Sequence, residues 1–256
     1  MTKSPPVGVH LSDAAPLIAA YRALFIEDSE LIDVEQALPE RDRVTVYLAN
    51  HGSFIAPFPA PMLTVAHLLE RGGYDDLVAV TLFHKVAELI PGLSPILRRF
   101  FGHSTPKLTS LSGLIELMKA RQFQIVGTAP EGWASIFTWD QPVGKLTKVG
   151  LMVAAFEADA DLILAVQKGM EVYGREAPLP FGLRLPISGR PRGFLFPVYW
   201  PGLRATIRVK FERYEPSLPF AQRQQLSPAE RRAWNEQEFE RVRLHMNELY
   251  RSIPDG

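Results

Sequence analysis

The 256-residue sequence contains no cysteine. Without thiols the chain forms no disulfide bond, offers no thiolate ligand to a metal and has no cysteine nucleophile. The absence also fits a reducing compartment. A Gly-x-Ser-x-Gly motif, the nucleophile elbow of α/β hydrolases, is missing as well, which disfavours a serine hydrolase of that type.

Net charge and long apolar runs are missing too. The chain has 28 basic and 28 acidic residues, so its overall charge indicates no partner. No apolar run approaches the 18 residues of a membrane-spanning helix, and Met1 to Pro6 are not followed by the apolar core of a signal peptide. We therefore expect a cytoplasmic protein without a spanning helix.

Charge is nevertheless unevenly distributed, because residues 184–210 contain six cations and no acid. They are Arg184, Arg190, Arg192, Arg204, Arg208 and Lys210. Aromatic residues are interleaved with them, a combination typical of the bilayer interface. The alternative is that the rings close the core beneath a long loop while the arginines point outward. A nucleic-acid surface would use the same residue types, but the recognition elements expected there are missing. We expect peripheral membrane contact and no nucleic acid.

Hydrophobic patterning predicts strands that alternate with helices. The expected strands are 44–49, 77–82, 123–126 and 162–166, and the expected helices are 12–25, 62–71, 83–90, 108–121 and 149–158. This alternation is typical of an α/β fold with a mostly parallel central sheet covered by helices.

The length suits one domain. Within it we expect an N-terminal amphipathic helix region at 12–40, an α/β core at 41–215 and a C-terminal helix at 225–251. Residues 205–211 alternate apolar and basic side chains, which predicts an edge strand. Ser227-Pro228-Ala229-Glu230 has the pattern of a capping box with proline in the first turn of the final helix.

Two polar turns follow expected strands, where an α/β sheet usually keeps its chemistry. Asn50-His51-Gly52-Ser53 follows strand 44–49, and Pro130-Glu131-Gly132 follows strand 123–126. A histidine there is suited to general base catalysis, because its unperturbed pKa lies near physiological pH. The alternative is a structural histidine beside an ordinary turn in which Glu131 caps the next segment.

The two turns together resemble the motifs of the glycerolipid acyltransferase superfamily, which includes lysophosphatidate and glycerol-phosphate acyltransferases. That family has Asn-His-x-Ser-x-x-Asp and, later, Phe-Pro-Glu-Gly-Thr-Arg-Ser, separated by a substrate-binding arginine block. The matching residues are Asn50, His51, Ser53, Pro130, Glu131, Gly132 and Ser135, with Arg98 and Arg99 in the position of the arginine block. The proline- and aromatic-rich stretch at 178–203 and the expected strand at 205–211 are similar to the later half of the family, especially its diacylglycerol-acyltransferase-like members.

The resemblance implies an acyltransferase that moves a fatty acyl group from acyl-CoA or acyl carrier protein to a lipid-like hydroxyl or amine. His51 would be the general base, and Glu131 would belong to the catalytic pair. The substrate-binding residues would be Ser53, Arg98, Arg99, Pro130, Gly132 and Ser135. The reaction requires no metal and no cofactor besides the acyl donor. The enzyme would act in the cytoplasm, peripherally at the membrane.

The sequence departs from the family pattern in three of its motifs. Trp133 replaces the threonine of the later motif, and Leu162 and Ala165 stand where the buried strand that follows it has prolines. Ala56 replaces the aspartate that orients the histidine, and Ala134 replaces the arginine of the later motif. Such a carboxylate fixes the imidazole tautomer and stabilises its positive charge. Glu131, the Asp75-Asp76 pair or a backbone carbonyl could take its place. The alternative function is that of a catalytically impaired, lipid-binding member of the same fold.

Overall fold

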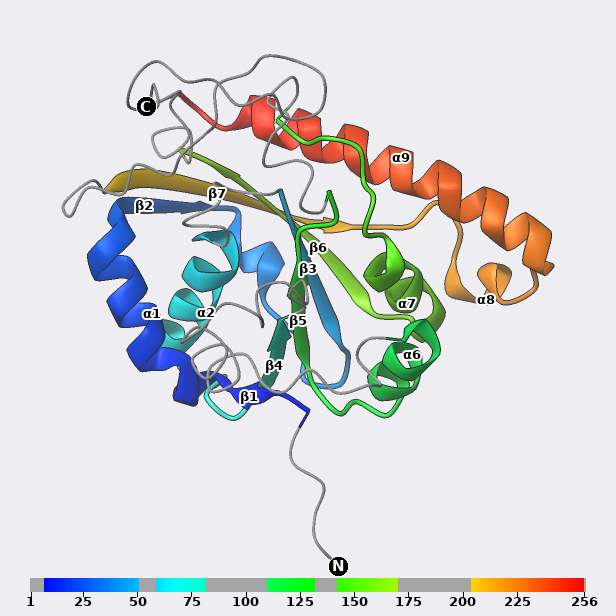
Figure 1. Cartoon of the computed structure of the whole chain (residues 1–256), viewed down its shortest axis with the longest axis horizontal. Helices are drawn as coiled ribbons and strands as arrows, with labels where there is room; N and C mark the ends of the chain where they lie inside the picture. Colours follow the sequence, from blue (N-terminus) through cyan, green and yellow to red (C-terminus); the bar gives the residue numbers. More distant parts are fainter. Residues whose placement is uncertain (1–6, 51–58, 82–109, 132–141, 170–203, 256) are drawn as a thin grey trace, which may run out of the picture.

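The computed structural model describes residues 7–50, 59–81, 110–131, 142–169 and 204–255 (Figure 1). These residues form a seven-stranded sheet in the order β1-β4-β5-β3-β6-β7-β2. The strands are β1 (Val9–His10), β2 (Ile26–Ile32), β3 (Thr45–Ala49), β4 (Val78–Thr81), β5 (Ile125–Thr128), β6 (Asp161–Lys168) and β7 (Ala205–Tyr214). The helices are α1 (Leu11–Phe25), η1 (Val34–Ala37), α2 (Pro59–Arg71), α6 (Leu111–Lys119), α7 (Gly150–Ala158), α8 (Phe220–Arg223) and α9 (Pro228–Ser252).

The middle of the sheet is parallel. Strands β4, β5, β3 and β6 run in one direction, and β2 is parallel to its neighbour β7. Antiparallel pairing occurs where β1 meets β4 and where β7 meets β6. The predicted α/β fold with a mostly parallel central sheet is therefore confirmed.

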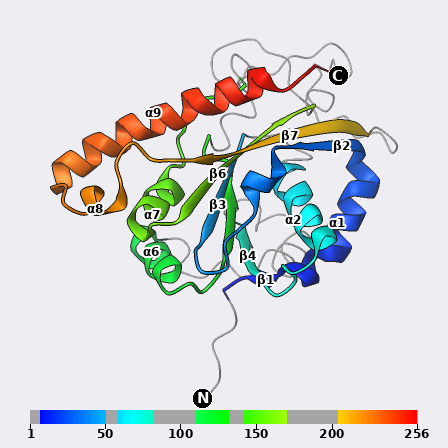
Figure 2. The same ribbon diagram turned by 180° about the vertical axis from the view of Figure 1, so that it is seen from behind.

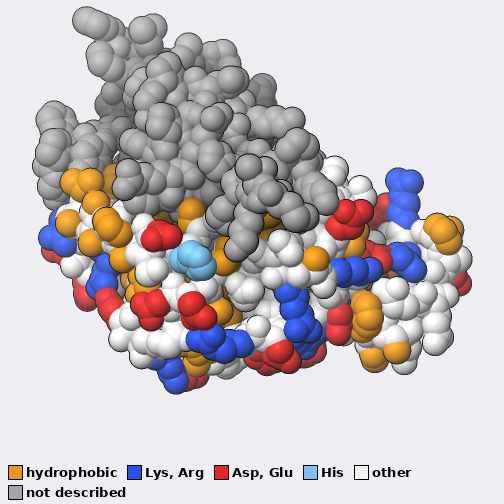
Figure 3. All heavy atoms as spheres, turned by 90° about the horizontal axis from the view of Figure 1, so that it is seen from below, with side chains coloured by type: hydrophobic (Ala, Val, Ile, Leu, Met, Phe, Trp, Pro, Cys, Tyr) orange, Lys and Arg blue, Asp and Glu red, His pale blue; other side chains and the backbone are white. Residues whose placement is uncertain are grey.

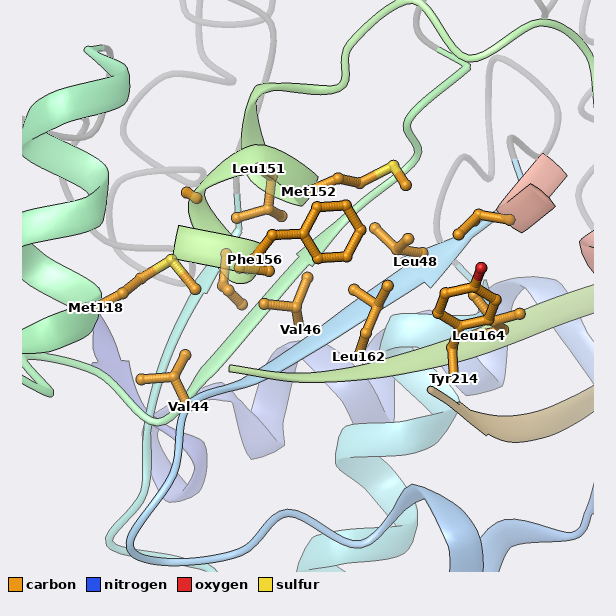
Figure 4. Close-up of a cluster of buried hydrophobic side chains, with 14 of the residues drawn as sticks. Val44, Val46, Leu48, Met118, Leu151, Met152, Phe156, Leu162, Leu164 and Tyr214 are labelled. Atoms are coloured by element: carbon orange, nitrogen blue, oxygen red, sulfur yellow. The ribbon is translucent and has the colours of Figure 1, made fainter. Parts of the chain in front are cut away.

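Helices cover both faces of the sheet. Helices α1 and α2 lie on one side, and α6, α7 and α9 lie on the other (Figures 1 and 2). In β3, Val46 and Leu48 pack toward Met152 and Phe156 of α7 (Figure 4), whereas Tyr47 belongs to the cluster on the α1 and α2 side. Because both sides of β3 are buried, its sequence is apolar almost throughout rather than alternating.

The expected helices and strands within the described residues are confirmed, with small shifts at their ends. Helix α2 begins at Pro59, three residues before the expected start, and ends before Gly72 and Gly73, whose φ angles of 77° and 82° are left-handed. Such angles favour glycine, which explains why the helix ends there. The helix expected at 83–90 lies outside the described residues.

The prediction of an edge strand at 205–211 is wrong. Strand β7 lies between β6 and β2, so β2 occupies the sheet edge beyond it. Arg208 of β7 is opposite Glu30 of β2, and its Nε lies 2.9 Å from a Glu30 carboxylate oxygen. The basic residues that suggested a solvent-facing edge thus face an acidic neighbouring strand.

The final helix begins as its sequence predicts. The Ser227 side chain accepts a hydrogen bond from the Glu230 backbone N–H, and the Glu230 carboxylate accepts one from the Ser227 N–H. These bonds lower the pKa of Glu230. Further along α9, Val242 and Met246 are fully buried in the core beside α7. The helix therefore closes one side of the sheet.

Candidate functional site

The four parallel strands β4, β5, β3 and β6 all have their carboxyl ends at one edge of the sheet. Strands β3 and β5 are neighbours, with Leu48 paired to Thr128. Asn50 and the Pro130-Glu131 turn follow these two strands by only a few residues. The structure thus brings the described parts of the two sequence motifs to the ends of adjacent strands, about 5 Å apart.

Asn50 is anchored by a reciprocal set of hydrogen bonds with Gln167 of β6. The Asn50 side chain accepts from the Gln167 backbone N–H at 2.7 Å and donates to the Gln167 carbonyl at 3.0 Å. In return, the Gln167 side-chain amide donates to the Asn50 carbonyl at 2.8 Å. Both residues are buried, so these bonds compete little with water. The residue that immediately precedes His51 is therefore fixed to the centre of the sheet.

Gln167 also binds the start of the next helix. Its Oε1 accepts a hydrogen bond from the backbone N–H of Ala60, at the beginning of α2, at 2.7 Å. The first N–H groups of a helix lack partners within the helix, so a buried acceptor stabilises this end. The chain segments before and after residues 51–58 are thus both bound to one side chain. Gln167 is not among the predicted site residues, and its signal in the sequence is weak, a single glutamine directly after the apolar strand 162–166.

The Pro130-Glu131 turn is bound to the chain that leads into α7. The Pro130 carbonyl accepts from the backbone N–H groups of Thr147 at 2.9 Å and Lys148 at 2.8 Å. The Thr147 hydroxyl donates to the Glu131 carbonyl at 2.6 Å, and Gly144 N–H donates to the Glu131 carboxylate at 2.5 Å. Glu131 is only 3% exposed. Its carboxylate is therefore held in a fixed place beyond β5.

Asp75 and Asp76 are a further suggested partner of His51, which itself lies outside the described residues. The two aspartates precede β4 and lie at the amino edge of the parallel strands, whereas Asn50 follows β3 at the carboxyl edge. The length of β3 separates the two edges by about 16 Å. Asp76 instead pairs with Arg41, whose hydrogen bond lowers the pKa of that carboxyl group. Figure 3 views the molecule from the amino edge of the parallel strands and shows acidic and basic side chains intermixed over the described residues.

The described cations of the basic stretch are bound within the fold. Arg204 donates to the Ile26 carbonyl, and Arg208 pairs with Glu30. Lys210 donates to the Ser252 hydroxyl at 2.9 Å. These cations stabilise β7 against its neighbours, which leaves Arg184, Arg190 and Arg192 as the part of the predicted patch outside the described residues.

Of the predicted site residues, the structure describes Pro130 and Glu131. The others are His51, Ser53, Arg98, Arg99, Gly132 and Ser135, which lie outside the described residues. Within the described ranges, no cluster of three or more histidine and acidic side chains could hold a metal ion, and no helix is long and apolar enough to cross a bilayer.

The chain is similar to an acyltransferase of known structure. This is the crystal structure of the 1-acyl-sn-glycerophosphate (LPA) acyltransferase PlsC from Thermotoga maritima. The sequence identity is 18% and the TM-score is 0.48, over 92% of this chain and 78% of PlsC. No protein-family model matches the chain, and no curated protein matches it significantly. A likeness this loose does not assign the chain to a family, so its function is proposed from its own residues.

Proposed function

We propose that this protein is an acyltransferase that moves a fatty acyl group from a thioester to a lipid-like hydroxyl or amine. The supporting observation is the position of Asn50 and Pro130-Glu131 at the carboxyl ends of adjacent parallel strands. His51 is joined to Asn50 by a peptide bond, so the two motifs that resemble the acyltransferase boxes start from neighbouring points. Carboxyl ends of parallel strands are the usual location of active sites in open α/β sheets.

In the proposed reaction, His51 removes the proton from the acceptor hydroxyl or amine. The acceptor then attacks the thioester carbonyl of acyl-CoA or acyl carrier protein, forming a tetrahedral intermediate. Collapse of this intermediate breaks the carbon–sulfur bond, and the proton passes from His51 to the departing thiolate. Backbone N–H groups of the turn at Gly132 are proposed to stabilise the oxyanion.

Glu131 is the carboxylate that we propose as the partner of His51. It replaces the aspartate missing at Ala56, and it lies at the same sheet edge as Asn50. The Gly144 N–H bond holds the carboxylate in place, which reduces the reorganisation needed when the imidazole becomes charged. Arg98 and Arg99 are proposed to bind phosphate groups of the donor or acceptor, because guanidinium groups bind phosphate in a bidentate manner.

A second candidate function is lipid binding without catalysis. Ala56 and Ala134 favour it, because they remove the orienting carboxylate and the arginine that the family motifs contain. The same fold would then keep an acyl-binding surface at the carboxyl edge but lack the proton-transfer machinery. In both cases we propose that the protein works peripherally at a membrane surface.

The absence of cysteine allows a direct test. Acyl transfer from acyl-CoA releases a free thiol, and a thiol reagent detects it without background from this protein. Purified protein should release CoA in the presence of lysolipid or long-chain alcohol acceptors. His51→Ala should abolish release, whereas His245→Ala, on α9, should retain it. Tight binding of lipid without thiol release across a broad acceptor panel would instead support the lipid-binding function.

A further inference from the structure

We propose that Gln167 is a positioning residue that places the His51 segment for catalysis. The inference rests on the proposed function, because it gives His51 the role of general base. It goes further in assigning a specific role to a side chain that belongs to neither of the motifs that resemble the acyltransferases.

The geometry of the bonds carries the inference. The Gln167 side chain uses its donor on the Asn50 carbonyl and its acceptor on the Ala60 N–H. These two backbone groups lie on opposite sides of residues 51–58 in the chain. One amide group therefore fixes where this segment leaves β3 and where it returns as α2.

Gln167 is also rigidly supported. It is 1% exposed and lies near the end of β6, which pairs with β3 on one side and β7 on the other. Its own backbone N–H and carbonyl are bound by the Asn50 side chain. A rotation of the Gln167 side chain would break its bonds to the Asn50 carbonyl and the Ala60 N–H, both of them buried. Because lost buried hydrogen bonds are costly, the Asn50 and Gln167 side chains have one favoured arrangement.

An apolar side chain of the same size would fill the same space but would release both anchor points. The chain on either side of residues 51–58 would then keep the bonds of the Asn50 side chain but lose both bonds to the Gln167 side chain. A displacement of about 1 Å at a catalytic group lowers a rate by roughly 100-fold. The loss should appear in kcat more than in KM, because Ser53 is the one proposed substrate-binding residue within this segment.

The test compares Gln167→Met with Gln167→Glu and a control, Tyr214→Phe. Gln167→Glu keeps an acceptor for Ala60 N–H but loses the donor to Asn50, and it serves if the methionine variant does not fold. Tyr214→Phe also loses one buried hydrogen bond, which the Tyr214 hydroxyl donates to Glu238 at 2.9 Å. The control lies far from the proposed site, because Leu162, the strand partner of Tyr214, is about 16 Å along β6 from Gln167. Thermal melts establish that each variant is folded.

Two measurements are made on each variant, the steady-state rate of acyl transfer and the NMR signals of the six histidine rings. We expect kcat to fall roughly 100-fold in Gln167→Met with KM changed less than about threefold. The His51 signal should move in both Gln167 variants while the other histidine signals stay in place. Tyr214→Phe should shift only His245, whose ring is 6.0 Å from that of Tyr214, and should retain wild-type kcat.

A folded Gln167→Met protein with wild-type kcat and an unmoved His51 signal would overturn the proposal. A uniform fall in kcat in all three variants would also overturn it, because that pattern reflects general destabilisation. If the wild-type protein transfers no acyl group, the proposed function fails, and the His51 signal alone then decides whether Gln167 positions this segment.

Discussion

The side chain of Asn50 binds the main chain of Gln167, and the side chain of Gln167 binds the main chain of Asn50. The ladder between β3 and β6 ends at the pair Ala49 and Ala165, and the Asn50 amide continues it with hydrogen bonds of its own. A strand end that would otherwise fray is thereby held firmly. The catalytic segment that we propose begins at this point.

Replacement of Glu131 separates its structural role from its proposed catalytic role. Glu131→Gln can still accept from Gly144 N–H, so we expect the free energy of unfolding to change by less than about 1 kcal/mol. The variant loses the negative charge, so kcat for acyl transfer should fall. Glu131→Ala removes the bond as well and should destabilise the fold by about 1–3 kcal/mol. Urea unfolding measures the change in stability, and acyl-transfer rates measure the change in kcat. Full activity in Glu131→Gln would show that Glu131 only stabilises the turn and has no catalytic role.

The proposed membrane contact can be tested with two matched pairs of cations. Arg190→Gln with Arg192→Gln removes two charges from the part of the basic stretch outside the described residues. Each cation near an anionic surface contributes about 1 kcal/mol, so binding to phosphatidylserine vesicles should weaken roughly 30-fold. Arg208→Gln with Lys210→Gln removes two charges that are bound to Glu30 and Ser252, and vesicle binding should change little. Equal losses in a co-sedimentation assay would contradict a contact through the first pair.

The buried Tyr47 makes the free energy of unfolding depend on pH in the alkaline range. Its phenol is buried and donates to the Ala37 carbonyl, and burial raises its pKa well above the usual value of about 10. Below pH 10 the phenol is protonated in both the folded and the unfolded state, so its full contribution to the free energy of unfolding is present. Above pH 10 the unfolded chain loses the proton first, so the free energy of unfolding falls as the pH rises.

Tyr47→Phe should therefore be less stable at pH 8, by about 1 kcal/mol, because the Ala37 carbonyl loses its donor. Its stability should also decline less steeply between pH 9.5 and 11. Urea titrations across this range measure both effects. An unchanged slope in the variant would show that Tyr47 is not the source of the alkaline dependence.

Much of the fold follows from local patterns in the sequence. The strand at Thr45–Ala49 begins with two β-branched residues and an aromatic one, and α9 begins with a complete capping box. The strand at Ile26–Ile32 was missed, because Glu27, Asp28 and Glu30 hide its apolar positions. Only its pairing with the basic residues of β7 explains those acids, and pairing between segments about 180 residues apart does not appear in a local pattern.

The candidate site was predictable where chemistry and strand position coincide. Asn50 and Pro130-Glu131 each follow a recognisable strand. Because the carboxyl ends of parallel strands lie at the same edge of the sheet, both were expected at that edge. The Asp75-Asp76 suggestion was made on charge alone, and the structure places these two residues at the sheet edge opposite Asn50. Gln167 was missed because its role depends on two backbone groups, and backbone hydrogen bonding leaves little trace in side-chain composition.

The most direct test of the proposed function is transfer of an isotopically labelled acyl chain from acyl-CoA into a lipid extract, followed by mass spectrometry of the lipids. We expect a labelled lipid product with the wild-type protein, and none with His51→Ala folded to the same melting temperature. A wild-type protein that leaves the label on CoA or releases it only as free fatty acid would contradict the proposed acyltransferase function.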